Sequence, residues 1–327
     1  MRAEPFLSAT YLGALVALAR SLNTEKHAMS ANLSKTAILV AAALIAALSQ
    51  RTLRAEDAKY ILYFGNSFTN ATCCGSTRSV PDLVSALAVA GGHPAPVTRN
   101  ASANGQSLEW HITASGRIIT IGVPSGEDWD HVVLQDFSTM PTRLGDLDQH
   151  LSSSLTLYEM TAARSPDVQA IMYETWARGP GHDFYTGASP SFPGGPSEMQ
   201  EEVRSGYQLS TAQIQAVGGL GAAKYAPVGD AWEAAGFPLD FYASDIYHAS
   251  NLGTLLNSMI LYGSMYGDRS LSDMDLAALL TSLSLSQADG ARVAALADAA
   301  LAVPEPAALG LVFIAAGLAC GVRRRFV

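Results

Sequence analysis

Short apolar runs alternate with longer stretches of helical periodicity in the middle of the chain, between residues 56 and 302. Apolar runs of roughly four to eight residues that are bounded by polar turns are typical of buried strands. This pattern predicts strands at residues 60–64, 95–100, 131–135, 168–173 and 225–228. Apolar positions at helical spacing predict helices around residues 80–90, 107–116, 144–164, 197–217, 250–266 and 271–300.

The alternation of strands and helices indicates the fold class. Parallel strands that are joined through helices need right-handed crossovers, which place helices on both faces of the sheet. The sequence therefore predicts a three-layer α/β/α sandwich with a mostly parallel, five-stranded sheet. In such a sheet the reactive groups gather at the carboxyl ends of the strands, so a candidate site is expected just past a strand. The stretch 179–196 is rich in Gly, Pro and aromatic residues and is predicted to be a long loop and a candidate lid.

The net charge of the folded region restricts the partners. The whole chain of 327 residues has a formal net charge of −9, but residues 56–302 alone hold 11 Lys/Arg and 26 Asp/Glu, a net −15. Phosphate binding needs clustered positive charge, and this region has no Lys/Arg run. The composition therefore excludes nucleic acid as a partner and favours a neutral ester or sugar over a polyanion.

Cysteine content bears on metals and on the compartment. The chain has 3 cysteines, too few for a disulfide framework, and no Cys/His spacing that is typical of a metal site. We therefore expect no metal and no cofactor. The adjacent residues Cys73 and Cys74 leave two alternatives open, a vicinal disulfide in an oxidising compartment or two free thiols.

The N-terminal region is predicted to be a signal peptide, at residues 29–55. Lys35 supplies a positive charge, residues 36–48 are apolar, and small residues follow up to Ala55. The apolar run is too short to span a bilayer comfortably. Signal peptides begin at the initiator, so we expect Met29 to be the start and residues 1–28 to be a mis-assigned extension. A longer N-terminal membrane anchor is the alternative.

The C-terminal residues resemble the PEP-CTERM sorting signal. Pro304-Glu305-Pro306 is followed by an uncharged stretch, residues 307–322, and then by Arg323-Arg324-Arg325. The resemblance implies an inner-membrane precursor whose Arg cluster stays cytoplasmic, and cleavage near Pro-Glu-Pro by an exosortase. The mature protein would then be periplasmic, on the cell surface or in the extracellular matrix of a Gram-negative-type bacterium. A plain C-terminal membrane anchor is the alternative.

A serine follows the first predicted strand, in Gly65-Asn66-Ser67. A tight turn there would expose the hydroxyl and leave a backbone N–H free to bind an oxyanion, although an ordinary turn fits the same residues. Near the other end of the domain, Asp245 precedes His248 by three residues. Such a carboxylate can accept the imidazole N–H and leave the other ring nitrogen to deprotonate a serine. A surface pair or a metal site is the alternative, but zinc would need a third ligand, and none stands nearby in the sequence.

These blocks together resemble the SGNH hydrolases of the GDSL esterase superfamily. Gly65-Asn66-Ser67 stands where that family has Gly-Asp-Ser, and Asp245-Ile246-Tyr247-His248 matches its last block. The resemblance implies a flavodoxin-like fold and a serine esterase. Ser67 would be the nucleophile, His248 the general base and Asp245 the residue that orients the base.

The resemblance also assigns an oxyanion hole. The backbone N–H groups of Ser67 and of Gly105, in Asn104-Gly105-Gln106-Ser107, would hold the oxyanion. After the third strand the family has Gly-x-Asn-Asp, whereas this chain has Leu134-Gln135-Asp136-Phe137-Ser138. Gln135 has the same amide chemistry on a longer arm and is the candidate for the third donor.

Four further residues are candidates for the substrate pocket. Asn66 and Asn104 precede the nucleophile and Gly105. Trp176 and Trp232 follow the fourth and fifth strands, and for both tryptophans a pocket role and a packing role are equally open. Their segments, Tyr-Glu-Thr-Trp at 173–176 and Pro-Val-Gly-Asp-Ala-Trp at 227–232, together with Gly-Asn-Ser-Phe-Thr, resemble a variant bacterial SGNH-like branch.

The sequence thus predicts a secreted serine esterase, an O-deacetylase that acts on carbohydrate or on another small ester. An O-acyltransferase on exopolysaccharide and a non-catalytic surface or biofilm-matrix protein are the alternatives. The expected partners are the acetylated substrate, signal peptidase and an exosortase. The predicted parts are an extra segment (1–28), a signal peptide (29–55), an SGNH-like hydrolase domain (56–290), a helix end and linker (291–302) and a sorting segment (303–327).

Overall fold

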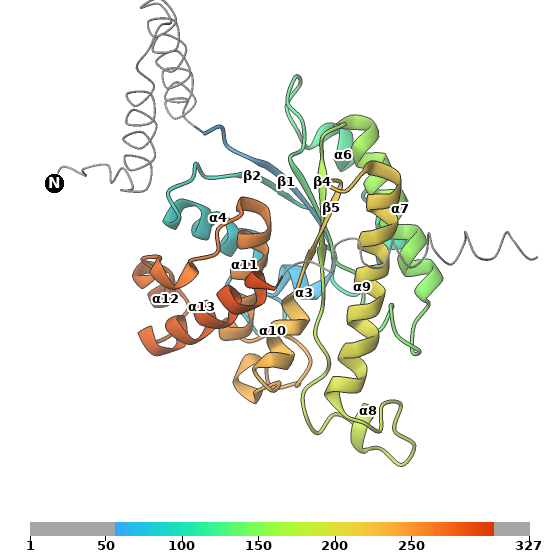
Figure 1. Cartoon of the computed structure of the whole chain (residues 1–327), viewed down its shortest axis with the longest axis vertical. Coiled ribbons are helices and arrows are strands. Elements are labelled where there is room, and N and C mark those ends of the chain that lie inside the picture. Colours follow the sequence, from blue (N-terminus) through green and yellow to red (C-terminus); the bar gives the residue numbers. More distant parts are fainter. Residues whose placement is uncertain (1–55, 304–327) are drawn as a thin grey trace, which may run out of the picture. The chain divides into compact units, whose positions relative to one another are not determined.

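The five predicted strands all form, and they pair in parallel in the order β2-β1-β3-β4-β5 (Figure 1). The computed structural model describes residues 56–303 of the chain. The strands are β1 (Tyr60–Phe64), β2 (Val97–Asn100), β3 (His131–Leu134), β4 (Gln169–Tyr173) and β5 (Ala223–Ala226).

Neighbouring strands end at nearly the same level of the sheet. Phe64, the last residue of β1, lies opposite Leu134, the last residue of β3. Leu134 in turn lies opposite Met172, one residue before the end of β4. The segments that follow these three strands therefore leave the sheet at one edge, which is where parallel sheets carry their reactive groups.

Helices cover both faces of the sheet (Figure 1). On one face lie α7 (Leu147–Arg164) and α9 (Pro196–Gly218), and on the other lie α4 (Val80–Ala90) and α11 (Asn251–Tyr266), with α13 (Gln287–Ala302) packed on α11. The predicted three-layer α/β/α sandwich is confirmed. The remaining helices are short: α3 (Ser67–Asn70), α5 (Leu108–Ala114), α6 (Ile118–Ile121), α8 (Asp183–Thr186), α10 (Val228–Ala234), α12 (Ala277–Ser282) and the 3₁₀ helices η1 (Leu239–Phe241) and η2 (Leu271–Asp273).

The predicted boundaries of the fifth strand, 225–228, are wrong. The strand begins and ends two residues earlier, at Ala223 and Ala226. Pro227 has no N–H to donate to a neighbouring strand, so it ends the ladder. Val228 is already the first residue of α10. The apolar run that predicted one strand is therefore shared between a strand and a helix.

The helix predicted over 271–300 is broken into three pieces. Ser284 has a φ of 55°, in the left-handed region that a continuing helix does not contain. Two residues later Ser286 begins a new helix through a capping box: its hydroxyl accepts the N–H of Asp289, whose carboxylate accepts the N–H of Ser286. The helical spacing of apolar residues continues through this turn, so the spacing alone does not reveal the break in the helix.

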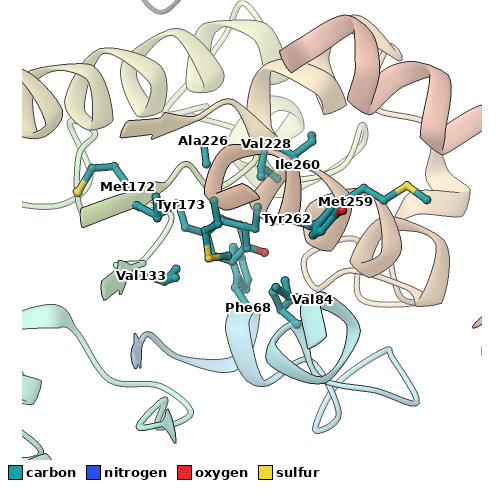
Figure 2. Close-up of a cluster of buried hydrophobic side chains, with 14 of the residues drawn as sticks. Phe68, Val84, Val133, Met172, Tyr173, Ala226, Val228, Met259, Ile260 and Tyr262 are labelled. Carbon is teal, nitrogen blue, oxygen red and sulfur yellow. The ribbon is translucent and has the colours of Figure 1, made fainter. Parts of the chain in front are cut away.

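One cluster of buried side chains joins the sheet to α4 and α11 (Figure 2). Val84 of α4, Val133 of β3 and Met259 of α11 are members, and each is fully buried. Phe68 of α3 belongs to the same cluster and is 2% exposed. The residue next to Ser67 is therefore embedded in the core, and this contact holds the one-turn helix α3 in place.

The predicted export signals lie outside the described residues. This applies to the signal peptide at 29–55 and to the sorting residues Pro304-Glu305-Pro306 and Arg323-Arg324-Arg325. Within residues 56–303, no helix combines the length and the apolar character that a membrane span requires.

Candidate active site

The chain turns sharply after β1, and this turn presents Ser67. Gly65 has no room for a side chain, because a Cβ there would lie 2.3 Å from Thr69 Oγ1. Asn66 caps α3 by accepting the N–H of Phe68 on its Oδ1 at 3.1 Å. Ser67 is the first residue of α3, so its own N–H has no acceptor within the helix. In the described part of the chain that N–H makes no other hydrogen bond, and it is available to a ligand.

Ser67, His248 and Asp245 form a continuous chain of contacts. His248 Nε2 lies 3.0 Å from Ser67 Oγ, and His248 Nδ1 lies 2.7 Å from Asp245 Oδ2. Ser67 is 8% exposed, so the hydroxyl lies at the surface of the core and within reach of a substrate. The structure thus brings together three residues from opposite ends of the domain in the geometry of a nucleophile, a base and an orienting carboxylate.

The loop around Asp245 explains how the carboxylate is held. Its Oδ1 accepts the backbone N–H groups of Tyr247 and His248, each at 2.9 Å, while Oδ2 faces the imidazole. Ile246 has a φ of 51°, and this left-handed residue folds the loop back on itself. Partial burial opposes ionisation of Asp245, but the hydrogen bonds from His248 and the two N–H groups outweigh it and lower the pKa of the carboxyl.

A stack of aromatic rings packs against the residue that follows the nucleophile. Phe68 stacks on Trp176 with ring centres 4.3 Å apart, and Trp176 stacks on Trp232 at 4.5 Å. Both tryptophans are fully buried, so of the two roles that the sequence left open, the structure favours packing over a place in the substrate pocket. These large rings fill the space between the loops and α11. Trp232 is also tied to α11 by the hydrogen bond that its N–H donates to Asn257.

The loop after β2 places a second free N–H near Ser67. Gly105 has a φ of 71° and is exposed, and its N–H makes no hydrogen bond to any described residue. Two side chains from the nucleophile turn hold this loop: Asn66 Nδ2 donates to the Gln106 carbonyl at 3.2 Å, and Asn70 Nδ2 donates to Asn104 Oδ1 at 3.0 Å. Asn66 is buried and occupied by these contacts, which gives it a bracing role rather than a place in the pocket. Asn104, in the loop after β2, is exposed to solvent.

The assignment of Gln135 as a third oxyanion donor does not fit the structure. Gln135 is fully buried, and its Nε2 donates to Asn66 Oδ1 at 3.0 Å and to the carbonyl of Asp136. Its Oε1 accepts the N–H of Asn66 at 3.0 Å and the hydroxyl of Thr69 at 2.8 Å. Both amide hydrogens are therefore used inside the fold. The longer arm of Gln reaches under the nucleophile turn and braces it, instead of pointing at the substrate.

Two further buried residues, to which the sequence assigned no catalytic role, support the same turns. His111 Nε2 donates to the Gly65 carbonyl at 2.8 Å, and burial lowers the pKa of His111, which keeps the ring neutral. Asp136 Oδ1 accepts the N–H of Leu108 at 3.1 Å and so ties the end of β3 to the start of α5. Their roles depend on contacts with residues far away in the sequence, which no local pattern shows.

Arg178 is the functional candidate that the sequence reading missed. It follows β4 at the same edge of the sheet and is only 8% exposed. Its guanidinium carbon lies 3.5 Å from the centre of the Tyr247 ring, and its Nη1 donates to Ser138 Oγ at 2.8 Å. The available signal was its place in the segment that follows the fourth strand, five residues after Tyr173.

The loop after α3 carries a disulfide between the adjacent residues Cys73 and Cys74. Of the two alternatives that the sequence left open, the structure has the vicinal disulfide. This loop packs against the residue after the histidine, because a Cβ on Gly75 would lie 2.4 Å from the Ala249 carbonyl oxygen.

A cavity of about 610 Å³ lies elsewhere, beside the edge strand β5 and between α9, α10 and α13, and no member of the triad lines it. Among the charged residues that line it, Arg204 pairs with Asp230 and Glu233. In residues 56–303 no group of three His, Cys, Asp or Glu side chains could hold a metal ion. The Ser67 edge is therefore the stronger candidate for chemistry.

No protein-family model matches the chain, and no curated protein matches it. Solved structures do. A protein from Slackia heliotrinireducens named as an SGNH hydrolase has a TM-score of 0.50 and 24% identity, with 64% of this chain and 100% of that chain covered. A DUF4886 family protein from Bacteroides uniformis has a TM-score of 0.55 and 16% identity, with 76% of this chain and 96% of that chain covered.

A family 3 carbohydrate esterase from Clostridium thermocellum is more distant, with a TM-score of 0.46, 12% identity, and coverage of 64% of this chain and 96% of that chain. The sheet order, the two helical layers and the first two likenesses agree with one another. The chain has the SGNH hydrolase fold.

Proposed function

We propose that the protein is a serine esterase that removes a small acyl group, such as acetyl, from carbohydrate or another alcohol. The observation that carries this proposal is the chain of contacts from Ser67 Oγ through His248 to Asp245. Two free backbone N–H groups, those of Ser67 and Gly105, accompany it. A nucleophile, a base and oxyanion donors are the parts that acyl transfer requires.

In the first half of the reaction, Ser67 Oγ attacks the carbonyl carbon of the ester while His248 Nε2 takes the hydroxyl proton. The carbonyl oxygen becomes an oxyanion, which the N–H groups of Ser67 and Gly105 stabilise. The tetrahedral intermediate then collapses: the bond from carbon to the alcohol oxygen breaks, and His248 gives its proton to the leaving alcohol. Asp245 remains ionised and keeps the imidazole in its orientation throughout.

In the second half, water attacks the acyl group on Ser67. His248 takes a proton from the water, a second oxyanion forms in the same place, and the bond to Ser67 Oγ breaks. His248 returns the proton to the serine, so the products are one carboxylic acid and the regenerated enzyme. If a sugar hydroxyl takes the place of water, the same residues perform an acyl transfer.

The first test is hydrolysis of nitrophenyl acetate by the purified full-length chain. We expect turnover in the wild type and a loss of roughly a thousandfold or more in Ser67→Ala, because triad residues act as one unit. Ser152→Ala is the matched control, since Ser152 is an exposed serine of α7 whose hydroxyl bonds only within its helix. Equal activity in wild type and Ser67→Ala would contradict the esterase proposal.

The carbohydrate substrate rests on the resemblance of the C-terminus to a sorting signal, whose systems accompany exopolysaccharide production. We expect the protein to release acetate from O-acetylated polysaccharide, measured with and without Ser67. An acyltransferase would instead leave the acetyl group on a sugar acceptor, which mass spectrometry of the sugars would show.

Export is proposed together with this activity. The predicted signal peptide and sorting segment would carry the domain out of the cytoplasm, with an exosortase and a signal peptidase as processing enzymes. The vicinal disulfide of Cys73 and Cys74 supports an oxidising compartment, because cytoplasmic thiols are kept reduced. N-terminal sequencing and fractionation of the expressed protein test this: retention of an unprocessed chain in the cytoplasm would contradict it.

A further inference from the structure

Arg178 is a buried cation at the edge of the sheet that carries the triad. Its guanidinium lies against the ring of Tyr247, the residue directly before His248, at 3.5 Å. It also lies 6.0 Å from the ring centre of Phe68, the residue directly after Ser67. The guanidinium therefore contacts the sequence neighbours of both the nucleophile and the base. Arg178 also donates a hydrogen bond to Ser138, which lies in the loop that follows β3.

This cation has no acidic partner in the described part of the chain. No Asp or Glu of residues 56–303 forms an ion pair with Arg178, although four other arginines of the domain do so. The Tyr247 side chain is the main hydrogen-bonding and electrostatic partner of Arg178, and the carboxylate of Asp245 attracts it more weakly. Asp245 already uses its oxygens on His248 and two backbone N–H groups. The domain has a net charge of −15, so carboxylates are abundant in it. The lack of an acidic ion-pair partner for Arg178 is therefore not due to a shortage of carboxylates.

A buried charge without a counter-ion is costly, and buried charges in proteins are as a rule paired with a group of opposite charge. Arginine holds its proton in such a place, and its planar fork matches a carboxylate. Of its five N–H groups, one is donated to Ser138 Oγ, which fixes the orientation of the fork. The guanidinium carbon lies 3.5 Å from the ring centre of Tyr247, 5.8 Å from that of Phe184 and 6.0 Å from that of Phe68, so three aromatic rings are its neighbours.

We propose that Arg178 binds a carboxylate carried by the ester substrate, a few bonds from the scissile carbonyl. This rests on the proposed esterase function and adds the substrate class to it: the ester is an anion with a single carboxylate, in place of the neutral ester that the net charge of the domain favoured. The carboxylate can belong to the acyl group, as in a half-ester of a dicarboxylic acid, or to the alcohol, as in an acylated uronic acid. The recognition is the same in both cases, a charge-assisted pair between guanidinium and carboxylate.

The test compares matched charged and neutral esters. If the carboxylate belongs to the acyl group (the acyl arm of the test), the pair is the nitrophenyl half-ester of glutaric acid and nitrophenyl valerate, and both rates are corrected for spontaneous hydrolysis. For the alcohol arm the pair is an O-acetylated methyl galacturonoside and the corresponding O-acetylated methyl galactoside. We expect the wild type to prefer the charged member of one pair in kcat/KM by roughly tenfold to a hundredfold, the range of a charged hydrogen bond. The arm that shows the preference identifies the source of the carboxylate.

Arg178→Gln is expected to abolish this preference, so that kcat/KM becomes equal for the charged and the neutral ester, and Arg178→Lys is expected to restore part of it. Arg292→Gln is the matched control: Arg292 also lies over an aromatic ring, Phe241, at 4.7 Å, but pairs with Asp240 at 2.6 Å. A variant that lowers kcat/KM equally for charged and neutral esters would show a structural role only and would overturn the proposal.

A second measurement needs no variant. Glutaramic acid is expected to inhibit hydrolysis of nitrophenyl acetate by the wild type more strongly than its neutral analogue glutaramide. Equal inhibition, together with equal kcat/KM for the members of both ester pairs, would overturn the carboxylate proposal and leave the esterase function standing. Activity that persists in Ser67→Ala would instead contradict the esterase function itself, so the two failures are distinguishable.

Discussion

Trp176 donates its indole N–H to the backbone carbonyl of Tyr247 at 3.1 Å. The bond joins the segment after β4 to the loop that carries Asp245 and His248, and Gly179 adds a second link by donating its N–H to the Ile246 carbonyl at 2.8 Å. Because the same Trp176 ring stacks on Phe68, one side chain contacts the neighbours of both the nucleophile and the base. It therefore fixes the separation of Ser67 and His248 without touching a substrate.

The first prediction is that Trp176→Phe lowers kcat while leaving KM nearly unchanged. Phenylalanine keeps most of the ring contact with Phe68 but loses the bond to Tyr247, so the histidine loop is held less firmly. Losing one buried hydrogen bond costs about 1 kcal/mol of stability, and we expect kcat to fall about tenfold. Trp232→Phe is the control: it removes an N–H that bonds Asn257 in the same stack, one ring further from His248. Equal kcat losses in the two variants would contradict a positioning role for Trp176.

The second prediction concerns the N–H of Gly105. Gly105→Ala has room for its Cβ but strains a backbone with a φ of 71°, which costs of the order of 1 kcal/mol and turns the N–H away from the oxyanion. Gly126→Ala has the same open surroundings and a φ of 91°, in a loop after α6. Thermal unfolding should show similar losses for both variants. Kinetics should show a fall of at least about tenfold in kcat for Gly105→Ala alone, and unchanged kcat in that variant would remove Gly105 from the oxyanion hole.

The strand pattern predicted where the site lies but not which way its side chains point. β1 begins and ends where the apolar run Tyr60–Phe64 does, because a strand that is buried on both faces must be apolar throughout. Asp245 and His248 are three residues apart, so their contact is a local property that the sequence can show. Gln135 and Arg178 both follow strands, yet one side chain folds inward and the other reaches across to Ser138. That difference depends on neighbours brought in by the tertiary fold, which no local pattern contains.

The third prediction separates bracing from catalysis at Gln135. In Gln135→Glu an oxygen replaces the Nε2 that now donates to Asn66 Oδ1 and the Asp136 carbonyl, so acceptors would face one another in a fully buried place. We expect the free energy of unfolding to fall by about 3 kcal/mol or more, the usual cost of an unpaired buried charge. Gln169→Glu is the control, because the Gln169 side chain lies at the surface with a single bond to the Gly221 carbonyl. Unchanged stability with a large loss of kcat would instead favour the oxyanion role.

The fourth prediction is a pH dependence that originates at Asp245. Its folded pKa lies below the ordinary value of 3.8, so the ionised carboxylate stabilises the fold above that pH, and this contribution is lost as pH falls through the lowered pKa. The stability difference between wild type and Asp245→Asn should therefore be present at neutral pH and vanish in acid. The same substitution should lower kcat by roughly four orders of magnitude, the size found in Ser-His-Asp triads, because an amide favours the wrong imidazole tautomer.

Asp289 provides the matched control for this prediction. Its pKa is also lowered from 3.8, in this case by hydrogen bonds from Ser286 at the start of α13, far along the chain from the triad. Asp289→Asn should show the same disappearance of its stability difference in acid, measured by urea unfolding at several pH values, but no change in kcat. If both variants kept full activity, Asp245 would be a helper of loop structure only, and the orienting role would have to be withdrawn. If only Asp245→Asn loses activity, the carboxylate acts on His248 as the geometry indicates.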